Sequence, residues 1–199
     1  MTISGGLRAR FIQDSIRIQI IGGLADLGWF DTDRRHAPLR YRAKPAEWAD
    51  EIERNTFAIT MEDVDDSPSE MGEGTTDDLR VFYIDFFAEN DSVGYHFVGD
   101  CSAIIDGRLP SIGRTGPVFD IYDLRQATPA SFVQVDVERV VTDRVEAQPR
   151  PWQRYWHYVR FDILDDHSDD YDGATLENIS EWPGSLTEAY SMMQEGLSG

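Results

Sequence analysis

The chain has one cysteine and one lysine, and it contains no long apolar run. Cys101 has no second cysteine to pair with, so no internal disulfide can stabilise the fold. No stretch reaches the roughly 18 apolar residues that a membrane-spanning helix needs, and the N-terminus lacks the apolar segment of a signal peptide. With 199 residues, 41% of them apolar, the chain can instead bury one good core. We expect a soluble protein that is made in the cytoplasm and has no membrane contact.

Positive charge is also scarce. The 18 Lys and Arg residues face 37 Asp and Glu residues, for a net charge of -19. Residues 1–54 hold nine basic and eight acidic residues, so the excess of acids lies after them. Binding to a nucleic-acid backbone needs clustered cations that replace counterions. The composition therefore argues against a protein that binds DNA or RNA through a broad basic surface.

No catalytic or metal-binding motif is complete. The acidic run 165–177 resembles the calcium loop of an EF-hand, but with Gly173 at position six, positions one and twelve hold Ser168 and Ile179. The bidentate acid that closes such a loop is missing, so a solvated acidic segment is favoured. The four His residues are widely separated, and Cys101 lies in a helical pattern typical of a small buried side chain. We expect no enzyme, no cofactor and no metal site.

The spacing of apolar residues predicts two main helices. In residues 7–29 they recur at three- and four-residue steps, which places them on one stripe facing a core. The middle of this segment, "SIRIQII", alternates polar and apolar residues as a strand does. A second helix over 92–107 follows the capping residues at 90–92 and ends at Gly107.

Alternating or continuous apolar runs predict the strands at 55–64, 79–88, 132–145 and 152–164, with a shorter one at 119–122. Pro38 and Pro45 bracket residues 39–44, which we expect to form a short edge strand. In 132–145 the alternation places Val137 with Arg139 on one face and Glu138 with Val140 on the other. The order of elements predicts an α+β fold, with a mostly antiparallel sheet of about four to five strands flanked by two main helices.

Two polar segments lie outside this pattern. Residues 65–76 separate two strands and are too long for a tight turn, so we expect a long hairpin loop or arm. We divide the chain into an α+β domain over 1–166 and an acidic C-terminal extension or arm over 167–199.

Several segments together resemble one family. They are "LADLGWF" (24–30), "LRVFYIDFFAEND" (79–91), "VGYHFVGDCSAIIDG" (93–107), "FVQVDVERVV" (132–141) and "QRYWHYVRFDILDDH" (153–167). In the order of their elements and the residue pattern of their strands, they resemble the tail terminator proteins of phages with long non-contractile tails, especially phages of actinobacteria. The resemblance covers residues 7–166 and includes no active-site motif.

The resemblance implies a structural protein of the virion. Tail terminators form a homo-hexameric ring on the head-proximal end of the tail tube, stop polymerisation of the major tail tube protein and join the head-completion or connector proteins of the neck. The ring would assemble in the host bacterial cytoplasm, and DNA would pass through its lumen without specific binding. Contacts are expected from the hairpin loop, the last strand and the start of the extension, through Asp65, Asp66, Ser69, Glu70, Met71, Glu73, Thr75, Trp156, Arg160, Asp165, Asp166, Asp169 and Asp170.

Two alternatives stay open. One is another neck protein or a tail-tube protein. A tube protein would also have two long terminal strands, but it would form open tubes in place of closed rings. A small acidic ligand-binding domain or enzyme would instead stay monomeric and carry a deep pocket.

Overall fold

The computed structural model describes residues 5–32, 36–42, 55–63, 77–109, 117–122, 131–145 and 155–166. Its elements in chain order are α1 (Gly5–Asp26), β1 (Arg40–Arg42), β2 (Thr56–Asp63), β3 (Asp77–Phe87), α2 (Asp91–Ile105), β4 (Val118–Tyr122), β5 (Ser131–Val145) and β6 (Trp156–Asp166). The α+β class is therefore confirmed. The sheet has six strands, one more than the upper end of the expected range, because the short strands β1 and β4 both join it.

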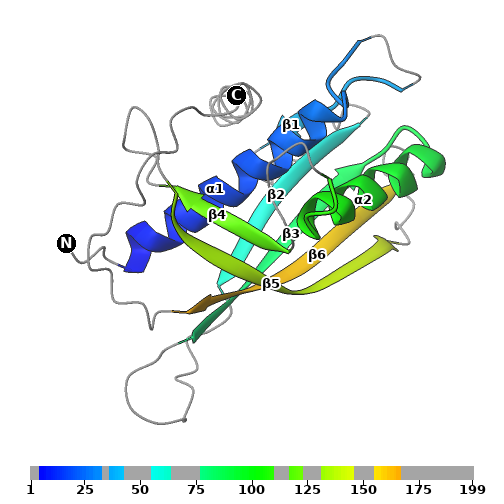
Figure 1. Ribbon diagram of the computed structural model, residues 1–199. Coiled ribbons are helices and arrows are strands. Elements are labelled where there is room, and N and C mark those ends of the chain that lie inside the picture. Colours follow the sequence, from blue (N-terminus) through cyan, green and yellow to red (C-terminus); the bar gives the residue numbers. More distant parts are fainter. Residues whose placement is uncertain are drawn as a thin grey trace.

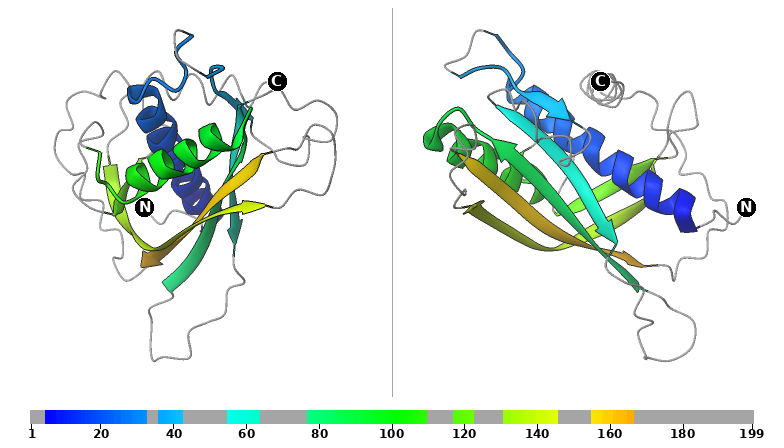
Figure 2. Two further views of the ribbon diagram at one scale, coloured as in Figure 1. Left: turned by 90° about the vertical axis from the view of Figure 1, so that its right-hand side faces the viewer. Right: turned by 180° about the vertical axis from the view of Figure 1, so that it is seen from behind.

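The strands form one curled sheet in the order β1-β2-β3-β6-β5-β4. Among the described strands, only the pairing of β1 with β2 is parallel. β2 and β3 are antiparallel neighbours, as predicted for a hairpin, while the loop expected between them lies outside the described residues. Both helices pack on the concave face of the sheet and cross each other there (Figures 1 and 2).

Aromatic side chains fill the space between the helices and the concave face. Phe86 of β3 stacks on Phe97 of α2 with ring centroids 3.9 Å apart, and Phe82 of β3 stacks on Phe161 of β6 at 5.1 Å. These residues alternate with outward-facing ones along their strands, as a period of two requires. Cys101 is fully buried here, and burial raises the pKa of its thiol well above the usual range, as does the charge of Asp100. The prediction of a small buried side chain at this position is confirmed.

α1 does not bury a single stripe, so that prediction is wrong. Ile18 and Ile21 lie off the expected stripe and are as fully buried as Ile12 and Ile16 on it. The helix lies across the opening of the curled sheet, with β2 on one side and β4 on the other (Figure 2). Apolar residues are therefore needed around most of its circumference.

The strand-like alternation within α1 follows from this position. Gln19 donates to the backbone carbonyl of Asp120 at 2.6 Å and accepts from its N–H at 3.3 Å, and Ser15 Oγ accepts from Tyr122 N–H at 2.9 Å. Arg17 points to the other side and donates from Nε and Nη2 to the carbonyl of Ile59 in β2. Two residues along a helix lie about 200° apart around its axis. Alternating polar side chains thus reach the edge strand β4 on one side of the helix. On the other side they reach β2 beyond Ala58, where its pairing with β1 ends, and in both places they bind backbone groups that no neighbouring strand in the described part of the chain pairs with.

A β-bulge changes the faces of β5. Val137 lies opposite Ile163, but the next aligned pair is Arg139 with Asp162, followed by Val140 with Phe161. Glu138 is therefore the extra residue, and every position after it moves to the other face. The predicted faces are wrong beyond this point, because Val140 packs on the core and Arg139 points away from it.

Candidate functional site

The predicted contact residues are described only in β6. Trp156 and Arg160 lie on its convex side, opposite the buried His157, Val159 and Phe161. The backbone at Asp165 and Asp166 pairs with Asp78 and Asp77 of β3. The other candidates, Asp65, Asp66, Ser69, Glu70, Met71, Glu73, Thr75, Asp169 and Asp170, lie outside the described residues, as does the extension over 167–199.

The first feature of interest is the convex face of β3 and β6. Trp156 stacks on Phe87 with ring centroids 5.4 Å apart, and its indole N–H donates to Asp85 Oδ1 at 2.9 Å. Burial raises the pKa of Asp85, against the effect of the Trp156 hydrogen bond and together with the charge of Glu62. The indole is thereby fixed on the sheet with its ring half-buried.

A second pair lies further along the same face. Arg160 donates from Nε to Asp162 Oδ1 at 3.1 Å, and its guanidinium carbon lies 6.0 Å from the ring centre of Tyr83, its cross-strand neighbour. A cation over an aromatic ring at this distance is attracted to it. We call Tyr83, Asp85, Phe87, Trp156 and Arg160 the convex aromatic face. Neither α1 nor α2 packs on it (Figure 2).

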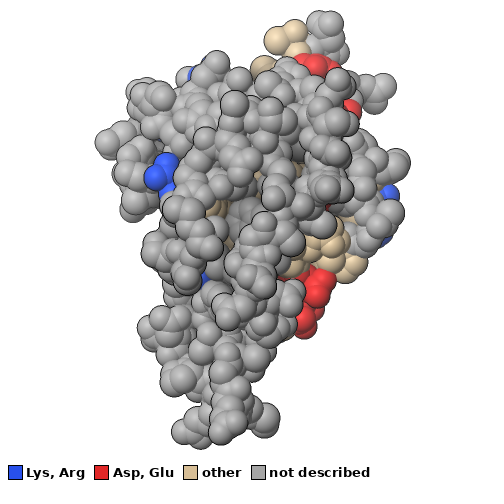
Figure 3. Space-filling model, turned by 60° about the vertical axis from the view of Figure 1, so that its left-hand side comes forward, with Lys and Arg blue, Asp and Glu red and all other residues tan. Residues whose placement is uncertain are grey.

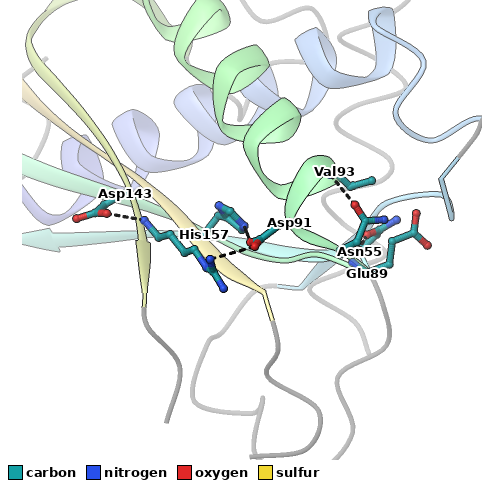
Figure 4. A network of polar contacts seen from close by, with 8 residues as sticks. Asn55, Glu89, Asp91, Val93, Asp143 and His157 are labelled. Atoms are coloured by element: carbon teal, nitrogen blue, oxygen red, sulfur yellow. Dashed lines mark hydrogen bonds and ion pairs between the residues drawn. The ribbon is translucent and has the colours of Figure 1, made fainter. Parts of the chain in front are cut away.

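The second feature is a polar network at the start of α2 (Figure 4). Asp91, in the first turn of the helix, accepts at Oδ1 from His157 Nε2 of β6 at 3.2 Å. Its Oδ2 lies 3.0 Å from Arg144 Nη1 of β5. We call these three residues the Asp91 cluster. It links α2 to two neighbouring strands of the sheet.

Adjacent residues fix the start of the helix. Asn90 is the N-cap, with extended backbone angles and a side-chain oxygen that accepts from Val93 N–H at 3.0 Å. Nearby, Asn55 has a left-handed φ of 58°, a conformation that Asn tolerates better than most residues. Its side chain donates to the carbonyl of Ala37 and accepts from the N–H of Glu89, so it joins the chain before β1 to the chain before α2.

A glycine allows the helix to approach His157 closely. A Cβ atom built on Gly94 would lie 2.1 Å from Cδ2 and Nε2 of the His157 ring. That separation is far inside van der Waals contact, so any side chain at position 94 would displace the ring or the helix. The imidazole has an exposed fraction of 0% and is wedged between β6 and the backbone of α2.

The described side chains offer limited chemistry. Within the described ranges, no group of three or more His, Cys, Asp or Glu residues is placed to hold a metal ion. No helix in the described part of the chain is long and apolar enough to cross a membrane. On the side shown in Figure 3, the described Arg, Asp and Glu side chains form small separate groups and no continuous patch of one sign.

Sequence reasoning placed Trp156 and Arg160 correctly on the outer face of β6, and their role as contact residues stays a prediction. It missed the Asp91 cluster. Asp91, Arg144 and His157 are far apart in the chain, and only the pairing of β5 with β6 brings the last two together. The one signal available was His157 among the apolar residues that alternate along its strand. The chain matches no protein-family model, and no curated protein matches it.

Proposed function

We propose that this protein is a structural component of a phage virion, a tail terminator. It forms a closed homo-hexameric ring on the head-proximal end of the tail tube, stops addition of the major tail tube protein and joins the neck proteins. DNA passes through the lumen of the ring without specific binding. The proposal rests on the family resemblance of residues 7–166, and the α+β fold with its two helices is the architecture that this resemblance implies.

The observation that best supports a structural role is the convex aromatic face. Both helices pack on the other side of the sheet, and this face holds an indole and a guanidinium in fixed positions. Trp, Tyr and Arg are the residue types that contribute most to binding energy at protein interfaces. Side chains that are already ordered lose less conformational entropy when a partner binds.

The contacts of β4 favour subunit association through this face over pairing at the β4 edge of the sheet. Where Asp120 and Tyr122 of β4 could pair with another strand, their backbone groups already bind Gln19 and Ser15 of α1. Edge pairing at these positions would first have to displace a buried helix. We therefore propose the convex aromatic face as one contact surface of the ring. The hairpin loop at 65–76 and the acidic segment from Asp165 onwards remain proposed contacts with the tube or a neighbouring subunit.

The decisive experiment is to measure the assembly state of the purified chain. Native mass spectrometry and negative-stain imaging, with and without tail tubes of the same virus, should show rings of six that cap tube ends. Long open tubes would instead favour a tail-tube protein. A monomer that ignores tubes would contradict the proposal and favour a ligand-binding domain or an enzyme.

A pair of variants then tests the surface. Trp156→Ala removes the indole from the convex aromatic face and should shift the hexamer towards monomers. Tyr95→Ala removes an exposed aromatic residue of α2 on the concave side and serves as the matched control. Equal effects of the two variants on assembly would contradict the assignment of this face.

A further inference from the structure

His157 combines three properties that are rarely found together: it is titratable, fully buried and in contact with the first turn of a helix. Its ring faces Asp91 and Tyr95 from α2 and Arg144 from β5. From β3, its cross-strand neighbour is the apolar Phe86. Among the described residues, the charged groups around the ring are thus one carboxylate and one guanidinium, and these two also pair with each other.

The hydrogen bond to Asp91 determines the tautomer of the neutral ring. A carboxylate can only accept, so the contact between Nε2 and Asp91 assigns the imidazole proton to Nε2. Nδ1 is then a bare acceptor, and it is buried with no hydrogen-bond partner among the described residues. A second proton on the ring would create a buried N–H donor and a positive charge at a position where the described residues offer no acceptor.

Asp91 only partly compensates such a charge. Its carboxylate is already shared with Arg144, and the side chains of both residues are more than a third exposed, at 36% and 38%. Burial lowers the pKa of His157, the hydrogen bond and charge of Asp91 act in the opposite direction, and the charge of Arg144 lowers it further. The neutral ring is therefore the form that fits between α2 and the sheet.

We propose that the Asp91 cluster is an acid-sensitive latch, which holds the first turns of α2 on the sheet while His157 is neutral and releases them when it is protonated. To hydrate Nδ1, the imidazolium must move out of the space beneath Gly94. The ring cannot do this while the helix backbone lies against it. The first half of α2 therefore lifts, while α1, which contributes no residue to the cluster, stays in place.

The sign of the pH dependence follows from linkage. The open state exposes His157, whose pKa returns to its ordinary value of about 6.5, and so the open state binds the extra proton more readily than the closed one. Opening is then favoured as pH falls below about 6.5, and the effect levels off once pH lies below the pKa of the closed state. At neutral pH and above, the latch is closed.

Amide hydrogen exchange on the full-length protein tests this directly. Protection factors, corrected for the intrinsic pH dependence of exchange, should fall for the amides of residues 94–98 between pH 7.5 and 5.0. Each unit by which the fold lowers the pKa of His157 allows up to about a tenfold fall. Protection in α1 should change much less. Equal losses in the two helices would overturn the proposal.

Two variants identify the responsible group. His157→Gln keeps a side-chain N–H for Asp91 but cannot titrate, so protection in α2 should lose its pH dependence. If this variant does not fold, Arg144→Gln serves instead, because it removes a partly exposed cation that opposes protonation. The ring signals of His157 followed by NMR, and the opening of α2 with them, should then move to higher pH. Persistence of the pH dependence in His157→Gln, or an unchanged titration in Arg144→Gln, would overturn the latch.

Discussion

The two helices lie on the same face of one sheet but are held there in different ways. α1 is buried around most of its circumference, and its polar side chains hydrogen-bond to the backbone of β2 and β4. α2 buries one apolar side and is fixed at its N-terminus by charged groups that solvent can reach. The helix with the poorer amphipathic pattern is thus the one more deeply built into the fold. A helix with a weak apolar stripe can still be firmly held when its polar side chains hydrogen-bond to backbone groups of neighbouring strands.

The largest effect is expected from removing the buried polar contacts that hold α1 on the sheet. Arg17→Met keeps an apolar stem but removes both hydrogen bonds to the carbonyl of Ile59. The variant loses hydrogen bonds from a charged donor and leaves a buried acceptor without them, so we expect the free energy of unfolding to fall by about 2–4 kcal/mol. Chemical denaturation measures this loss.

Arg10→Met is the matched control for that change. Arg10 and Arg17 both pair with Asp14, but their side chains are 76% and 9% exposed. An exposed ion pair of this kind contributes at most about 0.5 kcal/mol. Similar losses in the two variants would mean that the hydrogen bonds to the Ile59 carbonyl of β2 contribute little to stability. The proposed difference in how the two helices are held would then be wrong.

Gly94→Ala tests the close approach of α2 to the sheet. The added Cβ would overlap the buried ring of His157, which should cost about 1–3 kcal/mol of stability even after the gain in helix propensity. Gly99→Ala, five residues later in the same helix, meets no atom within 4 Å and should stabilise by up to about 1 kcal/mol. Thermal or chemical unfolding of the two variants should therefore give changes of opposite sign. A gain in both would show that His157 can move aside at little cost.

The elements were predictable from the sequence because their signals are local. Apolar spacing located both helices and five strands within a few residues of their observed bounds, and the flanking prolines located β1. The bulge at Glu138 was not predicted. Val137 and Val140 are three residues apart, so a regular strand places them on opposite faces, and only the register with β6 shows that both face the core. For the same reason, the faces of β5 were assigned correctly only before the bulge.

Contacts between distant segments escaped prediction for a different physical reason. The sequence shows only an irregular helical pattern at Ser15, Arg17 and Gln19, because their hydrogen-bonding partners on β2 and β4 lie far away in the chain. The Asp91 cluster has the same character, since three separate elements contribute one residue each. By contrast, the outward position of Trp156 and Arg160 was predicted, because alternation within a single strand is enough to separate two faces.

The smallest predicted effect concerns the cap of α2. Sequence offered capping residues at 90–92, and the structure uses Asn90, whose side chain accepts from Val93 N–H. Asn90→Ala should cost about 1 kcal/mol and should increase hydrogen exchange mainly in the first turn of α2. Ser92→Ala, at an exposed position two residues later, should change stability by less than about 0.5 kcal/mol. If Asn90→Ala left exchange in that turn unchanged, the Asp91 cluster alone would be sufficient to hold the start of the helix. The start of α2 would then be held by the charged groups of the Asp91 cluster alone. In the Asn90→Ala variant, the loss of hydrogen-exchange protection in α2 at low pH should then be larger than in the unsubstituted protein.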